Sequence, residues 1–219
     1  TVNIVDNIGP IIQTQNLSLE LDANGEVSTT AAAVDNGTTD NCGVAGISIS
    51  QENFTCDDLG VNTIVFTATD VNGNTTNGNV QITIIDNIDP VAVANDLVVE
   101  LDEDGNASIT ATQANDGSTD NCEITDMSVN PANFTCTNIG ANSVALTVTD
   151  GSGNSTTTNF NVNIEDNMAP EAIGQNLTLN LDGNSSVTTT AEAVDNGSSD
   201  NCEITDMTLS QYTFTEEGV

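Results

Sequence analysis

The residues best suited to chemistry in this chain are side-chain oxygens gathered in three short loops. The loops read VDNGTTDNC at 34–42, ANDGSTDNC at 114–122 and VDNGSSDNC at 194–202. Carboxylate and amide oxygens are the ligands that calcium requires, six to eight of them at about 2.3–2.6 Å. The chain has 33 Asp and Glu and no Lys, Arg or His, so no side chain of the protein can neutralise these loops. Carboxylates crowded together without a counter-charge would raise one another's pKa. The missing counter-charge must therefore come from solvent, salt or bound cations.

The same composition excludes several classes of function. Binding to nucleic acids and to anionic lipid surfaces depends on Lys and Arg, which this chain lacks, so we expect neither partner and no membrane insertion. Catalysis would have to use carboxylates alone, as in a paired-carboxylate glycosidase, and an enzyme has little use for one site repeated in tandem. We therefore expect no enzymatic activity. No run of about 18 apolar residues is present, and no signal peptide is visible.

Three copies of one sequence unit follow each other at an interval of 80 residues. Cys42 returns as Cys122 and Cys202, and the linker motif D-N-x-x-P begins at residues 6, 86 and 166. An 80-residue unit is too long for a solenoid coil and has the size of a small domain. The predicted divisions are the last strand of a preceding repeat at 1–6, repeat 1 at 7–86, repeat 2 at 87–166 and an incomplete repeat 3 at 167–219.

Within each repeat, apolar and polar residues alternate as they do in half-buried strands, and Gly-rich and Asp-rich turns separate the segments. This pattern predicts an all-β protein of tandem immunoglobulin-like or fibronectin-like antiparallel β-sandwich domains, with seven strands each, arranged as an extended rod. An odd strand number places the entry and exit of each domain at opposite poles. In repeat 1 we expect strands near 11–21, 25–34, 43–50, 53–56, 62–70 and 75–86, with one more short strand before 53.

The linker DNIDP (86–90), the block FTCDDLGVNTIVFTATDVNGNTT (54–76) and the strand VQITIIDN (80–87) together resemble the hyalin repeat. This immunoglobulin-like module occurs in extracellular proteins and is similar to the tandem repeats of very large surface adhesins in gliding and marine bacteria. The resemblance covers essentially the whole chain. It implies an adhesive or spacer module of the cell surface without enzymatic activity, and it names no ligand.

Five cysteines at 42, 56, 122, 136 and 202, without His and without C-x-x-C, indicate disulfides rather than zinc. They favour an oxidising, extracellular location at the cell surface. We expect pairs Cys42–Cys56 and Cys122–Cys136, each closing a loop of about 15 residues worth roughly 3 kcal/mol, with Cys202 unpaired. The expected strand order conflicts with the first pair. It places Cys42 at the start of one strand and Cys56 near the far end of another, whereas bonded cysteines have Cα atoms within about 7 Å.

With seven strands, the incoming linker, the acidic loop and the turn after the strand at 62–70 meet at one pole of each repeat. We expect calcium there, at the junctions between repeats, and the linker loosely resembles the D-x-N-D-N-x-P junctions of cadherins, where calcium stiffens the joint. The alternative is that each motif only forms a turn. The candidate ligands are Asp6, Asn7, Asp35, Asp40, Asn41, Asp70, Asn74, Asp86, Asn87, Asp89, Asp116, Asp120, Asn121, Asp150, Asn154, Asp166, Asn167, Asp195, Asp200 and Asn201.

Two other motifs are given no metal role. ELDANG (20–25) and ELDEDG (100–105) resemble part of an EF-hand loop, but the twelfth position falls on Ala31 or Ala111, where a bidentate Glu belongs. We expect hairpin turns at both. N-x-[ST] sequons are candidate glycosylation sites, among them Asn16, Asn36, Asn53 and Asn74.

The first functional hypothesis is therefore a calcium-stiffened stalk segment of a surface adhesin. The alternatives are a module that binds glycans or other cell-surface and matrix components, and a subunit of a self-assembling filament. The strand at 1–6 and the shortened third repeat fit a segment of a longer chain with neighbouring repeats. Strand addition from another molecule is the alternative, although one N-terminal strand would have to replace two missing ones.

Overall fold

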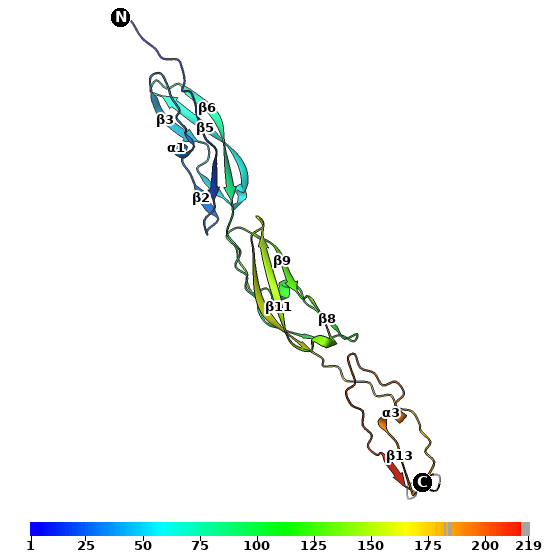
Figure 1. Cartoon of the computed structure of the whole chain (residues 1–219). Helices are drawn as coiled ribbons and strands as arrows, with labels where there is room; N and C mark the ends of the chain where they lie inside the picture. The colour runs from blue at the N-terminus through cyan, green and yellow to red at the C-terminus, as the bar shows by residue number, and fades with distance from the viewer. Residues whose placement is uncertain (182, 184, 216–219) are drawn as a thin grey trace. The chain divides into compact units, whose positions relative to one another are not determined.

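The computed structural model describes residues 1–181, 183 and 185–215 (Figure 1). The chain divides into two compact units, and each is described by itself. The first unit contains repeat 1 together with the acidic loop and the neighbouring turn of repeat 2, and its ranges are Thr1–Val93, Asp116–Ser128 and Thr147–Thr158. The second unit contains the remaining residues.

Repeat 1 is built from two small sheets. The four-stranded sheet has the order β1-β6-β5-β3, and β2 pairs with β4 in a second sheet. A one-turn helix, α1, follows β2, and a 3₁₀ turn, η1, follows β4. The bounds are β1 Leu17–Glu20, β2 Glu26–Ser28, α1 Ala31–Val34, β3 Val44–Ile49, β4 Asn53–Thr55, η1 Cys56–Asp58, β5 Gly60–Asp70 and β6 Thr75–Ile85.

The long hairpin of β5 and β6 supplies most of the core. Alternate residues of both strands are buried, and Ile64 of β5 lies opposite Val80 of β6. Phe54 of β4 is 1% exposed and packs in the same core cluster. This period of two is the reason that the strands at 43–50, 53–56, 62–70 and 75–86 were predictable, and these predictions are confirmed within one or two residues.

The structure corrects other parts of the prediction. Strand β1 runs parallel to β6, with Leu17 opposite Ile82, so the sheet is mixed rather than antiparallel. The segment 31–34, expected to end a strand, is helical because three consecutive alanines favour the helix. The turn at 22–25 is present, with Gly25 N donating to Asp22 O at 2.9 Å. It is not a hairpin, because β1 and β2 belong to different sheets.

Repeat 2 reproduces this plan, with sheet orders β7-β12-β11-β9 and β10-β8. Six strands are described in each of the first two repeats, and the predicted count of seven is not confirmed. Isolated bridges such as Ile11–Thr39 occupy the start of the predicted first strand. The bounds are β7 Leu97–Glu100, β8 Asn106–Ser108, α2 Ala111–Ala114, β9 Ile124–Asn130, β10 Asn133–Thr135, η2 Cys136–Asn138, β11 Gly140–Asp150 and β12 Ser155–Glu165.

Repeat 3 has β13 Ser186–Thr188 paired with β14 Thr213–Thr215, and α3 Ala191–Val194. Phe214 of β14 is 39% exposed, whereas Phe54, at the same position of repeat 1, is 1% exposed. A hollow of 280 Å³ lies between residues 170–174, α3 and residues 204–209. Among the described residues, repeat 3 has no counterparts of β5 and β6, the strands that cover the core of repeat 1.

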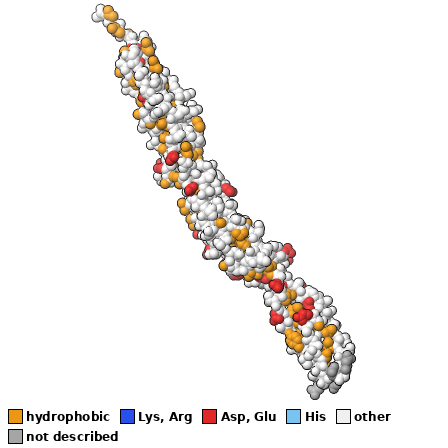
Figure 2. All heavy atoms as spheres, in the orientation of Figure 1, with side chains coloured by type: hydrophobic (Ala, Val, Ile, Leu, Met, Phe, Trp, Pro, Cys, Tyr) orange, Lys and Arg blue, Asp and Glu red, His pale blue; other side chains and the backbone are white. Residues whose placement is uncertain are grey.

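The surface of the chain is acidic and polar. Figure 2 shows small groups of acidic side chains and scattered apolar atoms among uncharged polar atoms on the visible face. No helix in the described part of the chain is long and apolar enough to span a membrane.

Candidate metal centre

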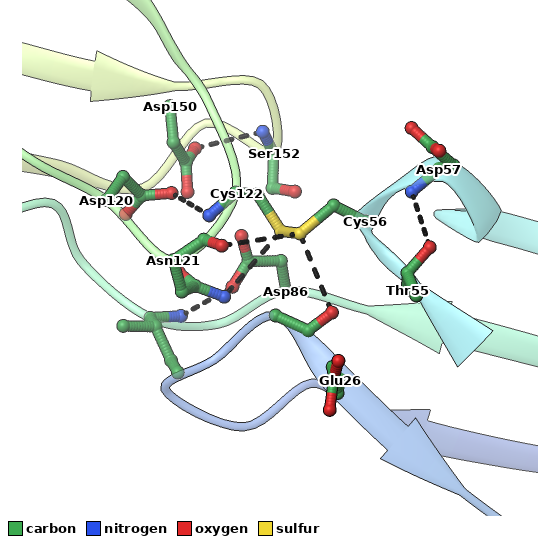
Figure 3. Close-up of a disulfide and its surroundings, with 12 residues drawn as sticks. Glu26, Thr55, Cys56, Asp57, Asp86, Asp120, Asn121, Cys122, Asp150 and Ser152 are labelled. Atoms are coloured by element: carbon green, nitrogen blue, oxygen red, sulfur yellow. Dashed lines mark hydrogen bonds between the residues drawn. A yellow bond between two sulfur atoms is a disulfide. The ribbon is translucent and has the colours of Figure 1, made fainter. Parts of the chain in front are cut away.

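Three carboxylates from separate segments meet in the first unit. Asp86 follows β6 in the linker, Asp120 lies in the acidic loop before β9, and Asp150 ends β11 (Figure 3). One oxygen of each lies within 4.8 Å of the other two. Oxygens bound to one calcium ion at about 2.3–2.6 Å are at most about 5 Å apart, so the three can share an ion.

Backbone amides fix Asp150 in place. Its Oδ1 accepts from the backbone N–H groups of Ser152, Gly153 and Asn154, at 2.6 to 2.9 Å. Its Oδ2 accepts from Asn154 Nδ2 at 2.7 Å. The same Asn154 amide donates to the backbone oxygen of Asp86 at 3.1 Å, and so joins this turn to the linker. Asp150 therefore forms a turn and is also a candidate metal ligand, so the two interpretations of this motif do not exclude each other.

Several buried oxygens of this centre receive no hydrogen bond from any described residue. They are Asp86 Oδ2, Asp120 Oδ1 and Asn121 Oδ1. Asp86 is only 3% exposed, and Asn121 Nδ2 donates to its other oxygen at 3.2 Å. A buried acceptor without a donor costs about 1–3 kcal/mol, and more when it is charged. A cation bound by the carboxylates would offset this cost for the carboxylate oxygens that it contacts.

A second centre of the same kind lies at the other pole of repeat 1. Asp6, Asp40 and Asp70 each place one oxygen within 4.8 Å of the others, and Asp6 Oδ2 and Asp40 Oδ2 are buried without a donor. Burial acts to raise the pKa of Asp70, but donors from Asn74, Asn72 and Gly73 outweigh it and hold that pKa below its ordinary value.

The groups around Asp6 also shift one another. The Ile8 backbone N–H, followed by the Cys42 thiol, lowers the pKa of Asp6. The hydrogen bond to Asp6 raises the pKa of the Cys42 thiol, as do burial and the charges of Asp6, Asp40 and Asp70.

The third repeat contains part of the same set. Asp200 Oδ1 and Asn201 Oδ1 are buried without a described donor, and Asp166 occupies the linker position of Asp86. Asp166 Oδ1 accepts from Met168 N at 3.2 Å, as Asp86 Oδ1 accepts from Ile88 N at 3.1 Å.

The structure places the other predicted ligands outside these clusters. Asp35 and Asp195 act in their own loops, where each accepts from the backbone N–H two or three residues later. The hydroxyls of Thr38 and Ser198 are the first causes that hold the two pKa values low. Asn7, Asn41, Asp89 and Asp116 are exposed, Asn87 and Asn167 donate to Glu20 and Glu100, and Asn74 and Asn154 orient Asp70 and Asp150.

The predicted disulfides are wrong. The bonds are Cys56–Cys122 and Cys136–Cys202, each with a Cα–Cα distance of 5.5 Å, and Cys42 is free and exposed. The physical reason is the conflict already visible in the sequence. Cys42 precedes β3, a strand of about 20 Å, and Cys56 lies beyond its end and beyond β4. Each bond therefore joins η1 or η2 of one repeat to the acidic loop of the next.

The disulfide and the metal centre share one junction. Asn121, between the candidate ligand Asp120 and the bonded Cys122, donates to the backbone oxygen of Asp22 in repeat 1 at 3.4 Å. A Cβ on Gly25 would lie 2.6 Å from the Asn121 carbonyl oxygen, so only glycine allows this approach. Asn201 and Asp102 repeat the contact in the second unit, at 3.1 Å.

The donor chemistry fits calcium. The three ligand groups of each cluster are carboxylates, and the chain has no histidine. Oxygen ligands are those that calcium and magnesium prefer, and calcium tolerates the irregular geometry that loops provide. Of the candidate glycosylation sites, Asn16, Asn36 and Asn53 are exposed, whereas the Asn74 amide donates to Asp70 and to the Asp6 carbonyl.

Comparison with known proteins gives only distant likenesses. No protein-family model and no curated protein matches the chain. Human mucin-like protocadherin EC1-2 has 12% identity and a TM-score of 0.36, over 72% of this chain and 98% of that one. Protocadherin gamma C5 EC1-3 has 13% identity and a TM-score of 0.37, over 71% of this chain and 68% of that one.

An endo-fucoidan hydrolase of glycoside hydrolase family 107 has 16% identity and a TM-score of 0.26, over 73% of this chain and 29% of that one. All of these TM-scores are below 0.5, so none of these likenesses assigns a function to the chain.

Proposed function

We propose that this chain is a segment of a non-enzymatic extracellular stalk, in which calcium ions stiffen the junctions between consecutive repeats. The observation that carries the proposal is the set of buried oxygens without donors around Asp86, Asp120 and Asn121. Three carboxylates without a basic residue anywhere in the chain need an external cation.

The position of Asp86 explains how an ion would stiffen the chain. This residue lies in the linker directly after β6, whereas Asp120 and Asp150 belong to repeat 2. An ion held by all three would tie the linker to the pole of repeat 2. The disulfide Cys56–Cys122 is a second, covalent tie across the same junction.

Two further features support an extracellular location and a spacer role. Disulfides persist in oxidising environments, and the chain has two. A formal net charge of -33 keeps such chains soluble and apart. The resemblance to hyalin repeats of surface adhesins implies the same role, in which the stalk spaces or presents an adhesive tip.

The direct test is calcium titration by isothermal calorimetry, combined with thermal unfolding in calcium and in a chelator. We expect Asp86→Asn to weaken binding and to remove much of the calcium-dependent rise in Tm. Asp89→Asn is the matched control, because it changes the same charge in the same linker at an exposed position outside the cluster.

A calcium-independent Tm in the unaltered chain would contradict the metal proposal. The stiffening itself is tested by small-angle scattering, in which the chelator should broaden the distribution of end-to-end lengths. An unchanged distribution, with calcium binding intact, would reject the stiffening role and leave the metal site.

A further inference from the structure

We propose that the pole of repeat 1 that carries Asp6 and Cys42 docks one more repeat of the same type, and that Cys42 forms a disulfide with the cysteine in the 3₁₀ turn of that repeat. The occupant is a preceding repeat of the same polypeptide, whose last strand is formed by residues 1–5. This inference concerns disulfide connectivity and does not depend on calcium binding.

The two other copies of this cysteine show the rule. Cys122 is bonded to Cys56 and Cys202 is bonded to Cys136, each 66 residues earlier in the chain. Cys42 occupies the same place in its own loop, and its backbone N–H donates to Asp40 as that of Cys122 donates to Asp120, both at 2.9 Å. Cys42 is therefore held in the same local arrangement as Cys122, but its thiol is free.

The segment that enters this pole carries an unpartnered apolar face. Val2 and Ile4 are 91% and 90% exposed, whereas the aligned Ile82 and Ile84 of β6 are 0% and 2% exposed. Residues of a strand that alternate in this way face a sheet interior. Residues 1–5 therefore have the pattern of a last strand, like β6, without the domain that would cover it.

The entry of this segment into the pole already has the geometry of a complete junction. Asn74 Nδ2 donates to the Asp6 carbonyl oxygen at 3.1 Å, and Asn154 Nδ2 donates to that of Asp86 at the same distance. The two poles differ in their contacts with a preceding repeat. Asn121 is half-buried and donates to Asp22 of the preceding repeat, while the aligned Asn41 is exposed.

The sequence of repeat 3 argues against end-to-end docking of a second copy of this chain. The partner pole needs a glycine where Gly25 and Gly105 stand, since a Cβ there would lie 2.6 Å from the carbonyl oxygen of the following repeat. It also needs a cysteine at the position of Cys56. Repeat 3 has Ser185 and Glu216 at these positions. The sequence of repeat 3 therefore lacks both residues, and a preceding repeat with Gly and Cys is the fitting partner.

The bond requires an oxidant. Cys42 and the partner cysteine each give up one hydrogen as the S–S bond forms. A small-molecule disulfide such as oxidised glutathione accepts these two electrons and two protons and leaves as two thiols.

The test extends the intact chain with its own sequence. Residues 1–6 are replaced by residues 1–86, so that one copy of repeat 1 precedes the present repeat 1. The protein is refolded in a glutathione redox buffer with a chelator, free thiols are alkylated, and disulfides are mapped by mass spectrometry of the non-reduced digest. We expect the added Cys56 to be bonded to the original Cys42, with one free thiol, the added Cys42.

The control carries Cys56→Ser in the added copy only, and we expect two free thiols in it. A second extended chain, with residues 87–166 in place of residues 1–6, should form the bond through the added Cys136 and guards against a folding defect in the first. A bond between the two cysteines of the added repeat, or an original Cys42 that is alkylated in both extended chains, would overturn the proposal.

Discussion

The pole at Asp86 and the pole at Asp6 each have three carboxylates at aligned sequence positions. They differ in the contacts that each pole makes with a preceding repeat. At the first, Asp86 is 3% exposed, Asn121 donates to Asp22 of repeat 1 and Cys122 is bonded to Cys56. At the second, Asp6 is half-buried, and both Asn41 and Cys42 are exposed.

This difference separates two contributions to the junction. The carboxylate cluster needs only one repeat and its incoming linker, since it is present at both poles. Burial of the linker carboxylate, the Asn contact and the disulfide need the preceding repeat as well. A junction thus combines a carboxylate cluster within one repeat with burial and a disulfide that the preceding repeat provides.

The largest expected effect comes from the covalent tie. The double change Cys56→Ser with Cys122→Ser removes a bond across a sequence separation of 66, which the chain-entropy estimate values at about 4 kcal/mol. Urea unfolding of the first unit without reductant should show this loss. Cys42→Ser should change the free energy of unfolding by less than about 0.5 kcal/mol, because this thiol is exposed and free. Equal effects of the two changes would erase the distinction between the poles.

Removal of calcium should have the next largest effect. A site at 100 times its dissociation constant stabilises the folded state by about 2.7 kcal/mol. We expect the pole at Asp86 to bind calcium more tightly than the pole at Asp6. Asp86 is buried, and electrostatic attraction is less screened there. In calorimetric titrations, Asp120→Asn should therefore abolish the tighter class of sites and Asp40→Asn the weaker class. Identical affinities would show that the preceding repeat adds nothing to binding.

The close approach at Gly25 is tested by substitution to alanine. Gly25 has a φ of 73°, and a Cβ would also meet the Asn121 carbonyl oxygen, so Gly25→Ala should cost about 2 kcal/mol of folding free energy. Gly60→Ala is the matched control, with a φ of 96° and nothing within 4 Å of a Cβ. It should cost only about 1 kcal/mol, measured by the same urea titration. If both substitutions lowered the free energy of unfolding equally, the contact between Gly25 and the Asn121 carbonyl oxygen would contribute nothing to stability.

The smallest expected effect is a dependence on pH at the same turn. The backbone N–H groups of Asn24 and then Glu26 hold the pKa of Asp22 below its ordinary value of 3.8. A carboxylate with a lowered pKa in the folded state stabilises it above pH 3.8, and this contribution is lost as the pH falls through the folded pKa. In a chelator, the Tm difference between the unaltered chain and Asp22→Asn should therefore shrink steadily as the pH falls from 6 through the folded-state pKa of Asp22. A difference that does not shrink between pH 6 and pH 2 would mean that the substitution acts through a steric defect and not through the lost charge.

The sequence by itself determined the repeats and the strands from 43 to 85, and it contained the three carboxylates at each pole only within a longer set of candidate ligands. These features follow from local regularities: an 80-residue period, a two-residue alternation and turn-forming Asp and Gly. Asp70 and Asp150 were predictable as candidate ligands because each lies in a turn formed by consecutive residues.

The tertiary structure alone decided the disulfides and the direction of β1. The cysteines nearest in sequence lie at opposite poles of repeat 1, and the bonded ones come from consecutive repeats. An odd cysteine count with pairs at a constant separation of 66 was the available signal, but the spacing has no meaning until the poles are placed in space. Likewise, β1 pairs with β6 across 65 residues, and no local pattern fixes whether such a pairing is parallel. The tertiary structure also decided which oxygens are buried without donors. Their burial arises where segments of two repeats meet, and the sequence pattern does not specify that contact.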